Sequence, residues 1–212
     1  MFLVCFAVKE EAAPFAARAK AMPGVRILVT GMGARNAERA LRPALQQPVG
    51  MVLTCGFAGG LNPALACGQV VFSLDEHPGL EAALRASGAQ PARFHFADRV
   101  ATTAAEKAAL RRETGADAVE MESRVMRNLC REQGIPSATV RVILDTAGED
   151  LPLDFNRLLT AEYQIHPGKL AAALLKSPGK VGALLAFRKQ TQAAAAELAR
   201  VLVAVTEKLP GR

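Results

Sequence analysis

Carboxylates stand at two places where the pattern of the chain changes. Glu120 and Glu122 flank Met121 just before an amphipathic helical run, and Asp145 ends the apolar run 138–144. In an open α/β sheet, ligands bind beyond the carboxyl ends of the strands, so an acid at that point is expected to face a crevice. Acids presented in this way can divide the work, one holding a hydroxylated substrate and another handling a proton.

A structural role is the alternative for each of these acids. Acids near a helix N-terminus are favoured by the helix dipole, and Asp145 could cap a turn or a helix. Because short motifs also match by chance, neither segment alone establishes a site. The surrounding elements must therefore decide between the two interpretations.

Length and composition indicate one globular domain over residues 1–212. The chain is long enough for a full core, half of its residues are apolar and 22% are charged. No apolar run is long enough to cross a membrane. The apolar start, 2–8, passes directly into Lys9 without a cleavage site, which indicates a first core strand and not a signal peptide.

The cysteines lack the spacing of a metal site or a disulfide framework. Three of them lie in apolar stretches, where free thiols behave as ordinary core residues. We therefore expect a reducing, cytoplasmic setting and no metal. The four residues are Cys5, Cys55, Cys67 and Cys130.

The net charge of +6 belongs to the C-terminal segment 169–212, which carries eight basic and two acidic residues. The rest of the chain is balanced, which argues against a nucleic-acid partner. Two interpretations of this basic helical segment remain open. It is either a solvated helix face or a contact with an anionic membrane surface.

Apolar runs alternate with helical patterns, which predicts a mostly parallel sheet covered on both faces. Strands are expected at 2–8, 25–30, 50–54, 68–74 and 138–144. Helices are expected at 9–20, 36–45, 103–114, 122–133, 169–176 and 180–208, with a shorter helical piece in 75–88. The segment 92–100 reads as a loop or an edge strand, whose aromatics either cover the core or form a lid over a base.

Two glycine-rich segments could bring backbone close to a ligand. Met32 and Gly33 follow the second expected strand, but a dinucleotide fingerprint would require glycine where Asn36 stands. The segment 55–63 has three glycines in five residues, which indicates either a loop whose amides point at a ligand or a tight turn.

Five segments, in this order, resemble the nucleoside phosphorylase and nucleosidase family, especially its methylthioadenosine/adenosylhomocysteine nucleosidase branch. They are Phe6–Glu11, Thr30–Gly33, Gly56–Pro63, the VEME motif Val119–Glu122, and Val140–Ala147. The resemblance implies a three-layer α/β/α sandwich around a twisted, mixed and mostly parallel sheet. It also implies cleavage of a purine N-ribosyl bond, a homo-oligomer (dimer or larger), and no metal or organic cofactor.

The resemblance also implies roles for single residues. Asp145 would donate a proton to purine N7, and Glu11 would position the attacking water. Glu122 would bind the ribose hydroxyls, Met121 would pack on the sugar, and Arg141 would sit behind the site, paired with an acid. An oxocarbenium-like transition state needs such nearby negative charge and an acid for the leaving group. The other expected substrate-binding residues are Glu120, Met32, Gly33, Phe57, Ala58 and Gly59.

The chain departs from the family pattern at two positions. Phe57 and Leu144 stand where the hydrolases have serine, which implies a more apolar substrate, a different way of holding water, or weakened activity. The segment after Gly56 lacks an arginine of the kind that holds phosphate, which favours hydrolysis. Arg35 and Arg141 keep phosphorolysis open.

Three hypotheses follow. The first is a nucleosidase that releases adenine from a 5′-substituted adenosine. The segments 100–107 and 144–152 and the basic tail resemble a narrower branch, the hopanoid-associated phosphorylases, which are thought to act on adenosylhopane. The second is a phosphorylase with phosphate as co-substrate. The third is a nucleoside-binding or peripheral-membrane protein that has lost catalysis.

Overall fold

The fold is built on one mixed sheet of eight strands. The computed structural model describes residues 1–75, 77–160, 166–176 and 178–209. The strands are β1 (Phe2–Phe6), β2 (Val25–Val29), β3 (Met51–Gly60), β4 (Val70–Leu74), β5 (Gln90–Pro91), β6 (Phe94–Phe96), β7 (Ala118–Glu120) and β8 (Ser137–Asp145).

The strand order is β2-β1-β3-β8-β4-β5, with β7 and β6 added beside the end of β3. Strands β2, β1, β3 and β8 run parallel to one another. Strand β4 is antiparallel to β8, and β7 is antiparallel to β3. The carboxyl ends of the long parallel strands therefore meet at one edge, as a ligand crevice requires.

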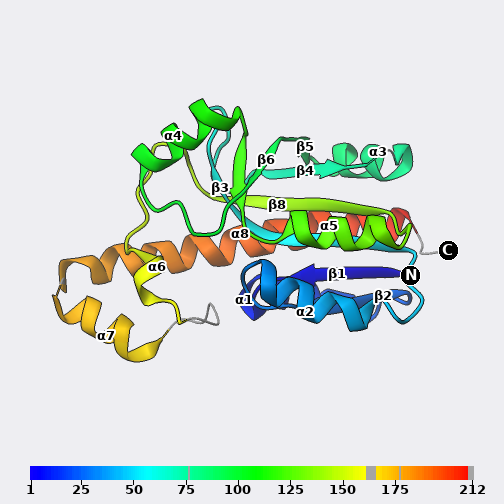
Figure 1. The fold of residues 1–212 in the computed structure, drawn as a ribbon, viewed down its shortest axis with the longest axis horizontal. Coiled ribbons are helices and arrows are strands. Elements are labelled where there is room, and N and C mark those ends of the chain that lie inside the picture. Colours follow the sequence, from blue (N-terminus) through cyan, green and yellow to red (C-terminus); the bar gives the residue numbers. More distant parts are fainter. Residues whose placement is uncertain (76, 161–165, 177, 210–212) are drawn as a thin grey trace.

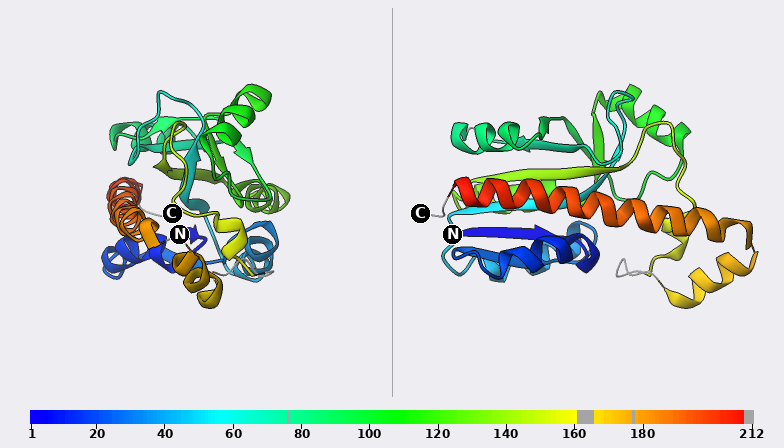
Figure 2. Two further views of the ribbon diagram at one scale, coloured as in Figure 1. Left: turned by 90° about the vertical axis from the view of Figure 1, so that its left-hand side faces the viewer. Right: turned by 180° about the vertical axis from the view of Figure 1, so that it is seen from behind.

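Helices cover both faces of the sheet (Figures 1 and 2). On one face α1 (Lys9–Ala19), α3 (Pro78–Ala86) and α8 (Val181–Lys208) bury apolar residues against β1, β3, β4 and β8. On the other face α2 (Ala34–Ala44) and α5 (Ser123–Glu132) share a second apolar cluster with β1 and β3. The predicted three-layer α/β/α architecture is confirmed.

Further helices lie at the carboxyl edge of the sheet. They are α4 (Ala104–Thr114), α6 (Phe155–Leu158) and α7 (Pro167–Lys176). Helix α8 is longer than the sheet that it covers, so its first turns project beyond this edge beside α6 and α7 (Figure 2). Its buried residues all lie between Ala194 and Thr206. Among the described residues, no helix combines the length and apolar character needed to cross a membrane.

One expected boundary was wrong. The glycine-rich segment 55–63 was expected to be a loop or turn, but β3 continues through it to Gly60. Backbone pairing explains the difference, because β8 pairs with β3 on one side as far as Gly59 and β7 pairs with Gly59 and Gly60 on the other. Glycine is disfavoured in a strand, so the sequence signal pointed to a loop.

Candidate active site

A buried arginine forms the centre of the candidate site. Arg141 projects from β8 and is 1% exposed. Its Nη2 donates to Glu120 at 2.6 Å and to Glu122 at 3.3 Å, and its Nη1 donates to the carbonyl of Cys55 at 3.1 Å. The predicted pairing of Arg141 with an acid is therefore present. Both terminal nitrogens of this guanidinium are therefore engaged within the protein, while its buried Nε has no hydrogen-bond partner among the described residues.

Glu120 has its carboxylate fully occupied. Besides Arg141, it accepts hydrogen bonds from the backbone N–H groups of Glu122 and Ser123 and from the Ser123 hydroxyl. These bonds fix the entry into α5, where backbone N–H groups lack partners within the helix. The geometry thus gives Glu120 a structural role, and its expected contact with substrate stays a prediction.

Glu122 connects the start of α5 to the glycine turn after β2. Its Oε1 accepts from the backbone N–H of Gly33 at 2.8 Å, and Gly33 has a φ of 83°, which favours glycine. The pKa of Glu122 is raised to about 7, chiefly by burial; Arg141 opposes the rise, and Glu120 and Glu11 contribute to it. This carboxyl therefore titrates near neutral pH.

Glu11 lies at the start of α1, at the carboxyl end of β1. Its carboxylate accepts from the backbone N–H groups of Ala7, Val8 and Phe57 at 2.9–3.1 Å. Burial raises its pKa, while Arg141 and the three N–H groups oppose that shift. The bond to Phe57 joins helix α1 to β3 at the level of Arg141.

Gly56 separates Glu11 from Arg141. A Cβ atom at this position would lie 2.6 Å from Arg141 Nη1 and 2.7 Å from Glu11 Oε1, and the φ of 146° disfavours other residues. The glycine therefore permits the close approach of an acid and a base across β3.

Asp145 ends β8 and is buried beside β3. It pairs with Gly59 in the sheet register, and a Cβ at Gly59 would lie 3.5 Å from Asp145 Oδ2. The carboxylate forms an ion pair with Lys107 of α4. Burial raises the pKa of Asp145, and the Lys107 ammonium partly offsets the rise.

Strand β3 brings these groups together. Its residues 56–59 touch Glu11 and Arg141 at one end and Asp145 at the other, a span of about 10 Å at 3.3 Å per residue. Glu122 joins the same cluster through Arg141. The cluster holds more carboxyl groups than cations, so its ionised members can stabilise a positively charged transition state.

The remaining predicted residues are close in sequence to the members of this cluster. Met32, Phe57, Gly59 and Met121 are partly exposed, and each is adjacent in the chain to a group already described. Ala58 instead is buried in an apolar cluster with Ile143 of β8.

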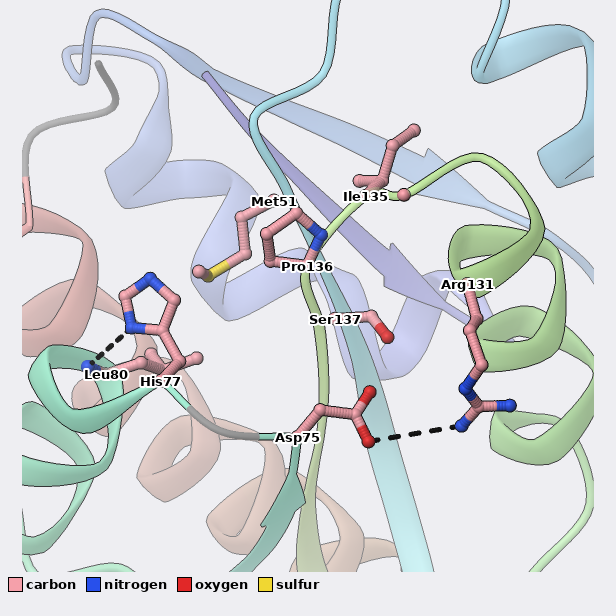
Figure 3. A pocket seen from close by; sticks show the side chains of 9 residues that line it. Met51, Asp75, His77, Leu80, Arg131, Ile135, Pro136 and Ser137 are labelled. Carbon is pink, nitrogen blue, oxygen red and sulfur yellow. Dashed lines mark hydrogen bonds and ion pairs between the residues drawn. The ribbon is translucent and has the colours of Figure 1, made fainter.

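Two cavities lie at the sheet, one away from the cluster and one that borders it at Glu120. One of about 230 Å³ lies at the opposite edge of the sheet, where β3 and β8 begin, and is lined by residues that include Asp75, His77 and Arg131 (Figure 3). It is smaller than the roughly 300–1,000 Å³ of typical ligand sites. The other, of about 380 Å³, lies between α5 and β6, where the Arg124 guanidinium stacks 4.2 Å from the centre of the Phe96 ring. The 94–96 aromatics thus form a small strand beside this second cavity.

Sequence reasoning missed Lys107. The sequence assigned no role to this lysine, which ends the segment 100–107, yet its side chain is fully buried. The helix around it contains mostly small and charged residues, with a leucine three residues further on. This pattern does not distinguish a buried lysine from an exposed one. Among the described residues, no cluster of His, Cys, Asp and Glu could hold a metal ion.

Comparisons with known proteins match part of the chain by sequence and nearly all of it by fold. The phosphorylase superfamily model matches residues 92–176, fewer than half of the chain. A search of curated protein sequences found no match.

Solved structures match over nearly the whole chain. A mutant of futalosine hydrolase from Helicobacter pylori strain 26695 has a TM-score of 0.70 at 15% identity, covering 98% of this chain and 99% of that chain. The 5′-methylthioadenosine/S-adenosylhomocysteine nucleosidase of Campylobacter jejuni gives 0.70 at 18%, with 98% and 99% covered. That of Neisseria meningitidis, in complex with methylthio-immucillin-A, gives 0.71 at 16%, with 97% and 98% covered.

At these identities the structural likeness establishes the fold. The superfamily match contains the VEME motif, Arg141 and Asp145. The superfamily model thus matches the part of the chain that holds most of the candidate site, and the solved structures establish the fold that this chain shares with them.

Proposed function

We propose that this protein is a purine nucleoside N-ribosyl hydrolase that releases adenine from a 5′-substituted adenosine. The observation that carries the proposal is the convergence of Glu11, Glu122 and Asp145, which are far apart in sequence, around residues 56–59 of β3. Neighbouring structures of the same fold are named as nucleosidases and a futalosine hydrolase, which supports the same class of reaction.

In this proposal Asp145 donates its proton to N7 of the purine, and the bond between C1′ and N9 breaks with its electron pair moving to the base. Water held by Glu11 adds to C1′, and its proton passes to the Glu11 carboxylate. Glu122 accepts hydrogen bonds from the ribose hydroxyls, and Met121 packs on the sugar. The excess of buried carboxylates stabilises the oxocarbenium-like transition state.

The protonation states fit these roles. Burial raises the pKa of Asp145, which favours the proton that a general acid must carry. Burial raises the pKa of Glu11, with Arg141 and three backbone N–H groups opposing the rise, and a raised pKa strengthens a base that takes a proton from water. No metal or organic cofactor enters the proposed reaction.

Hydrolysis is favoured over phosphorolysis because Arg141 is buried against Glu120 and Glu122. A phosphate dianion is bound best by a charged donor that is not already engaged within the protein. Arg35, an exposed residue at the start of α2, is the donor that keeps phosphorolysis open. The test is adenine release from 5′-methylthioadenosine and adenosine, with and without phosphate. We expect release without phosphate; strict phosphate dependence with ribose 1-phosphate as product would establish the phosphorylase instead.

Variants separate catalysis from binding alone. Glu11→Gln should abolish most of the adenine release, while Glu10→Gln, which changes an exposed neighbour on the same helix, should leave it intact. No release from the wild-type protein would favour the third hypothesis, a nucleoside-binding or peripheral-membrane protein. Full turnover by Glu11→Gln would refute the assigned role.

We propose further that the 5′ substituent is apolar, as in adenosylhopane, and that α8 contacts a membrane. In its projecting first turns Val181 is 44% and Leu185 is 56% exposed, and Lys180, Arg188 and Lys189 are exposed nearby. Sedimentation with vesicles containing anionic lipid should pull down the wild type and less of Leu185→Ser. Equal binding to neutral vesicles, or no binding, would contradict the membrane contact.

Oligomerisation and location belong to the same proposal. Strand β2 forms an edge of the sheet, and Val29 at its end is 41% exposed, which suits contact with a second copy. Light scattering should therefore show a homo-oligomer, and a monomer would count against it. All four cysteines are free thiols, which supports a cytoplasmic location.

A further inference from the structure

Lys107 is an unusual residue for the place that it occupies. It is the one buried residue of α4, all of which is described, and its exposed fraction is 0%. Lysine is almost never fully buried unless its charge is paired. Helix α4 packs Leu110 against an apolar cluster, but the side chain that it buries fully is a cation.

The local structure holds this lysine in place. The Thr103 hydroxyl accepts from the N–H of Glu106, and the Glu106 carboxylate accepts from Thr102 and Thr103, so α4 begins with a closed cap. The helix ends at Gly115, whose φ is 65°. Lys107 thus lies on a turn that is fixed at its start.

The ammonium contacts three oxygens, two by hydrogen bonds and one by an ion pair. Nζ donates to the carbonyls of Thr146 and Glu149 at 2.8 and 2.7 Å, and it forms the ion pair with Asp145. The partners all come from the end of β8 and the segment that follows it. Lys107 therefore fixes both the Asp145 carboxylate and the backbone beside it.

Stability alone is a poor reason for this pair. Removing two charges from water costs more than their attraction commonly returns, and apolar residues of similar size often replace a buried pair without loss. A buried charge that contacts the proposed general acid therefore points to the chemistry of that acid.

We propose that Lys107 is a positioning residue for Asp145. Its ammonium holds the carboxyl at the end of β8, and it stabilises the carboxylate that remains once Asp145 has given its proton to purine N7. This inference rests on the nucleosidase function proposed above. No group is oxidised or reduced, and the proton that is transferred passes from Asp145 to the purine.

The charges around Asp145 give the sign of the expected effect. Burial raises its pKa, Lys107 of α4 lowers it, and Glu149 of the following segment raises it; Cys67, before β4, is the other titratable neighbour. A general acid works while protonated, so activity falls as pH rises through this pKa. Loss of the Lys107 charge should therefore move the basic limb of the pH–rate profile to higher pH. It should also slow the reaction, because Asp145 would hold the proton that it donates more tightly.

The test is the pH dependence of kcat and kcat/KM for adenine release from 5′-methylthioadenosine. In Lys107→Met we expect the basic limb to rise by about 1–3 pH units and kcat to fall by roughly 10- to 100-fold, part of what a positioned acid contributes. Lys107→Gln, whose amide can still donate to the two carbonyls, should show the same shift if Lys107→Met does not fold. Arg112→Met removes an exposed charge from the same helix and should leave the profile unchanged.

Glu149→Gln tests whether the basic limb of the pH–rate profile reports the pKa of Asp145. Loss of this exposed carboxylate should lower that pKa and move the basic limb slightly to lower pH. A folded Lys107 variant with lower stability but an unmoved profile would show a structural role only and would overturn the inference. Absence of adenine release from the wild-type protein would instead overturn the proposed function, and the positioning role with it.

Discussion

Replacement of Glu122 by glutamine tests the electrostatics of the site without a substrate. The side chain is buried, accepts from the backbone N–H of Gly33 and lies 3.3 Å from Arg141 Nη2. Glutamine keeps the shape and can still accept from Gly33, but it cannot ionise. The variant therefore removes the charge and preserves most of the packing.

The expected magnitude follows from the pKa. Burial, with help from Glu120 and Glu11, raises the pKa of Glu122 from 4.5 to about 7. At about 1.4 kcal/mol per unit, the ionised form costs the folded state roughly 3 kcal/mol. Because the folded pKa is raised, this contribution to stability is fully present below pH 4.5 and is lost as pH rises towards 7.

The wild-type free energy of unfolding should therefore fall between pH 4.5 and 7 by about 3 kcal/mol relative to that of Glu122→Gln. Urea denaturation followed by far-ultraviolet circular dichroism measures both proteins, which lack tryptophan. Glu10→Gln, at an exposed position, should show no such pH-dependent difference. A difference between Glu122→Gln and wild type that stays flat, or that falls with rising pH, would refute the reasoning and show that Arg141 outweighs the burial.

Three further outcomes are expected. Gly56→Ala should lower the free energy of unfolding by about 2–4 kcal/mol, because its Cβ would meet Glu11 and Arg141; Gly148→Ala, where a Cβ meets nothing within 4 Å, should change urea denaturation little. Arg141→Met should cost about 3–5 kcal/mol in the same assay, since it leaves buried carboxylates without their cation, and a neutral result would contradict the cluster's charge state. Asp145→Asn should reduce kcat for adenine release by about 10²–10⁴ while calorimetry still detects nucleoside binding; retained turnover would remove Asp145 from the mechanism.

Much of the fold could be predicted from the sequence, because the spacing of apolar residues and the positions of glycine and proline indicate the same helices and strands. The expected helix 103–114 and the strand 138–144 match α4 and β8 closely, since a capping residue and a continuous apolar run mark them. The glycine-rich end of β3 could not be predicted in the same way. Its extended form depends on β7 and β8, which are distant in sequence.

The candidate site divides along a similar line. Motif order indicated Glu11, Glu122, Arg141 and Asp145 as one set, and the structure brings them to one edge of the sheet. Motif order did not separate Glu120, whose oxygens are all used within the protein. Nor did it indicate Lys107, because the burial of this lysine depends on the contact of α4 with the end of β8, which a sequence pattern does not show.

A crystal structure of Asp145→Asn with 5′-methylthioadenosine tests the central claim most directly. We expect the purine N7 within hydrogen-bonding distance of the side chain at position 145 and the ribose hydroxyls on Glu122. A nucleoside bound elsewhere, for example in the cavity beside Asp75 and His77 at the opposite edge of the sheet, would contradict it.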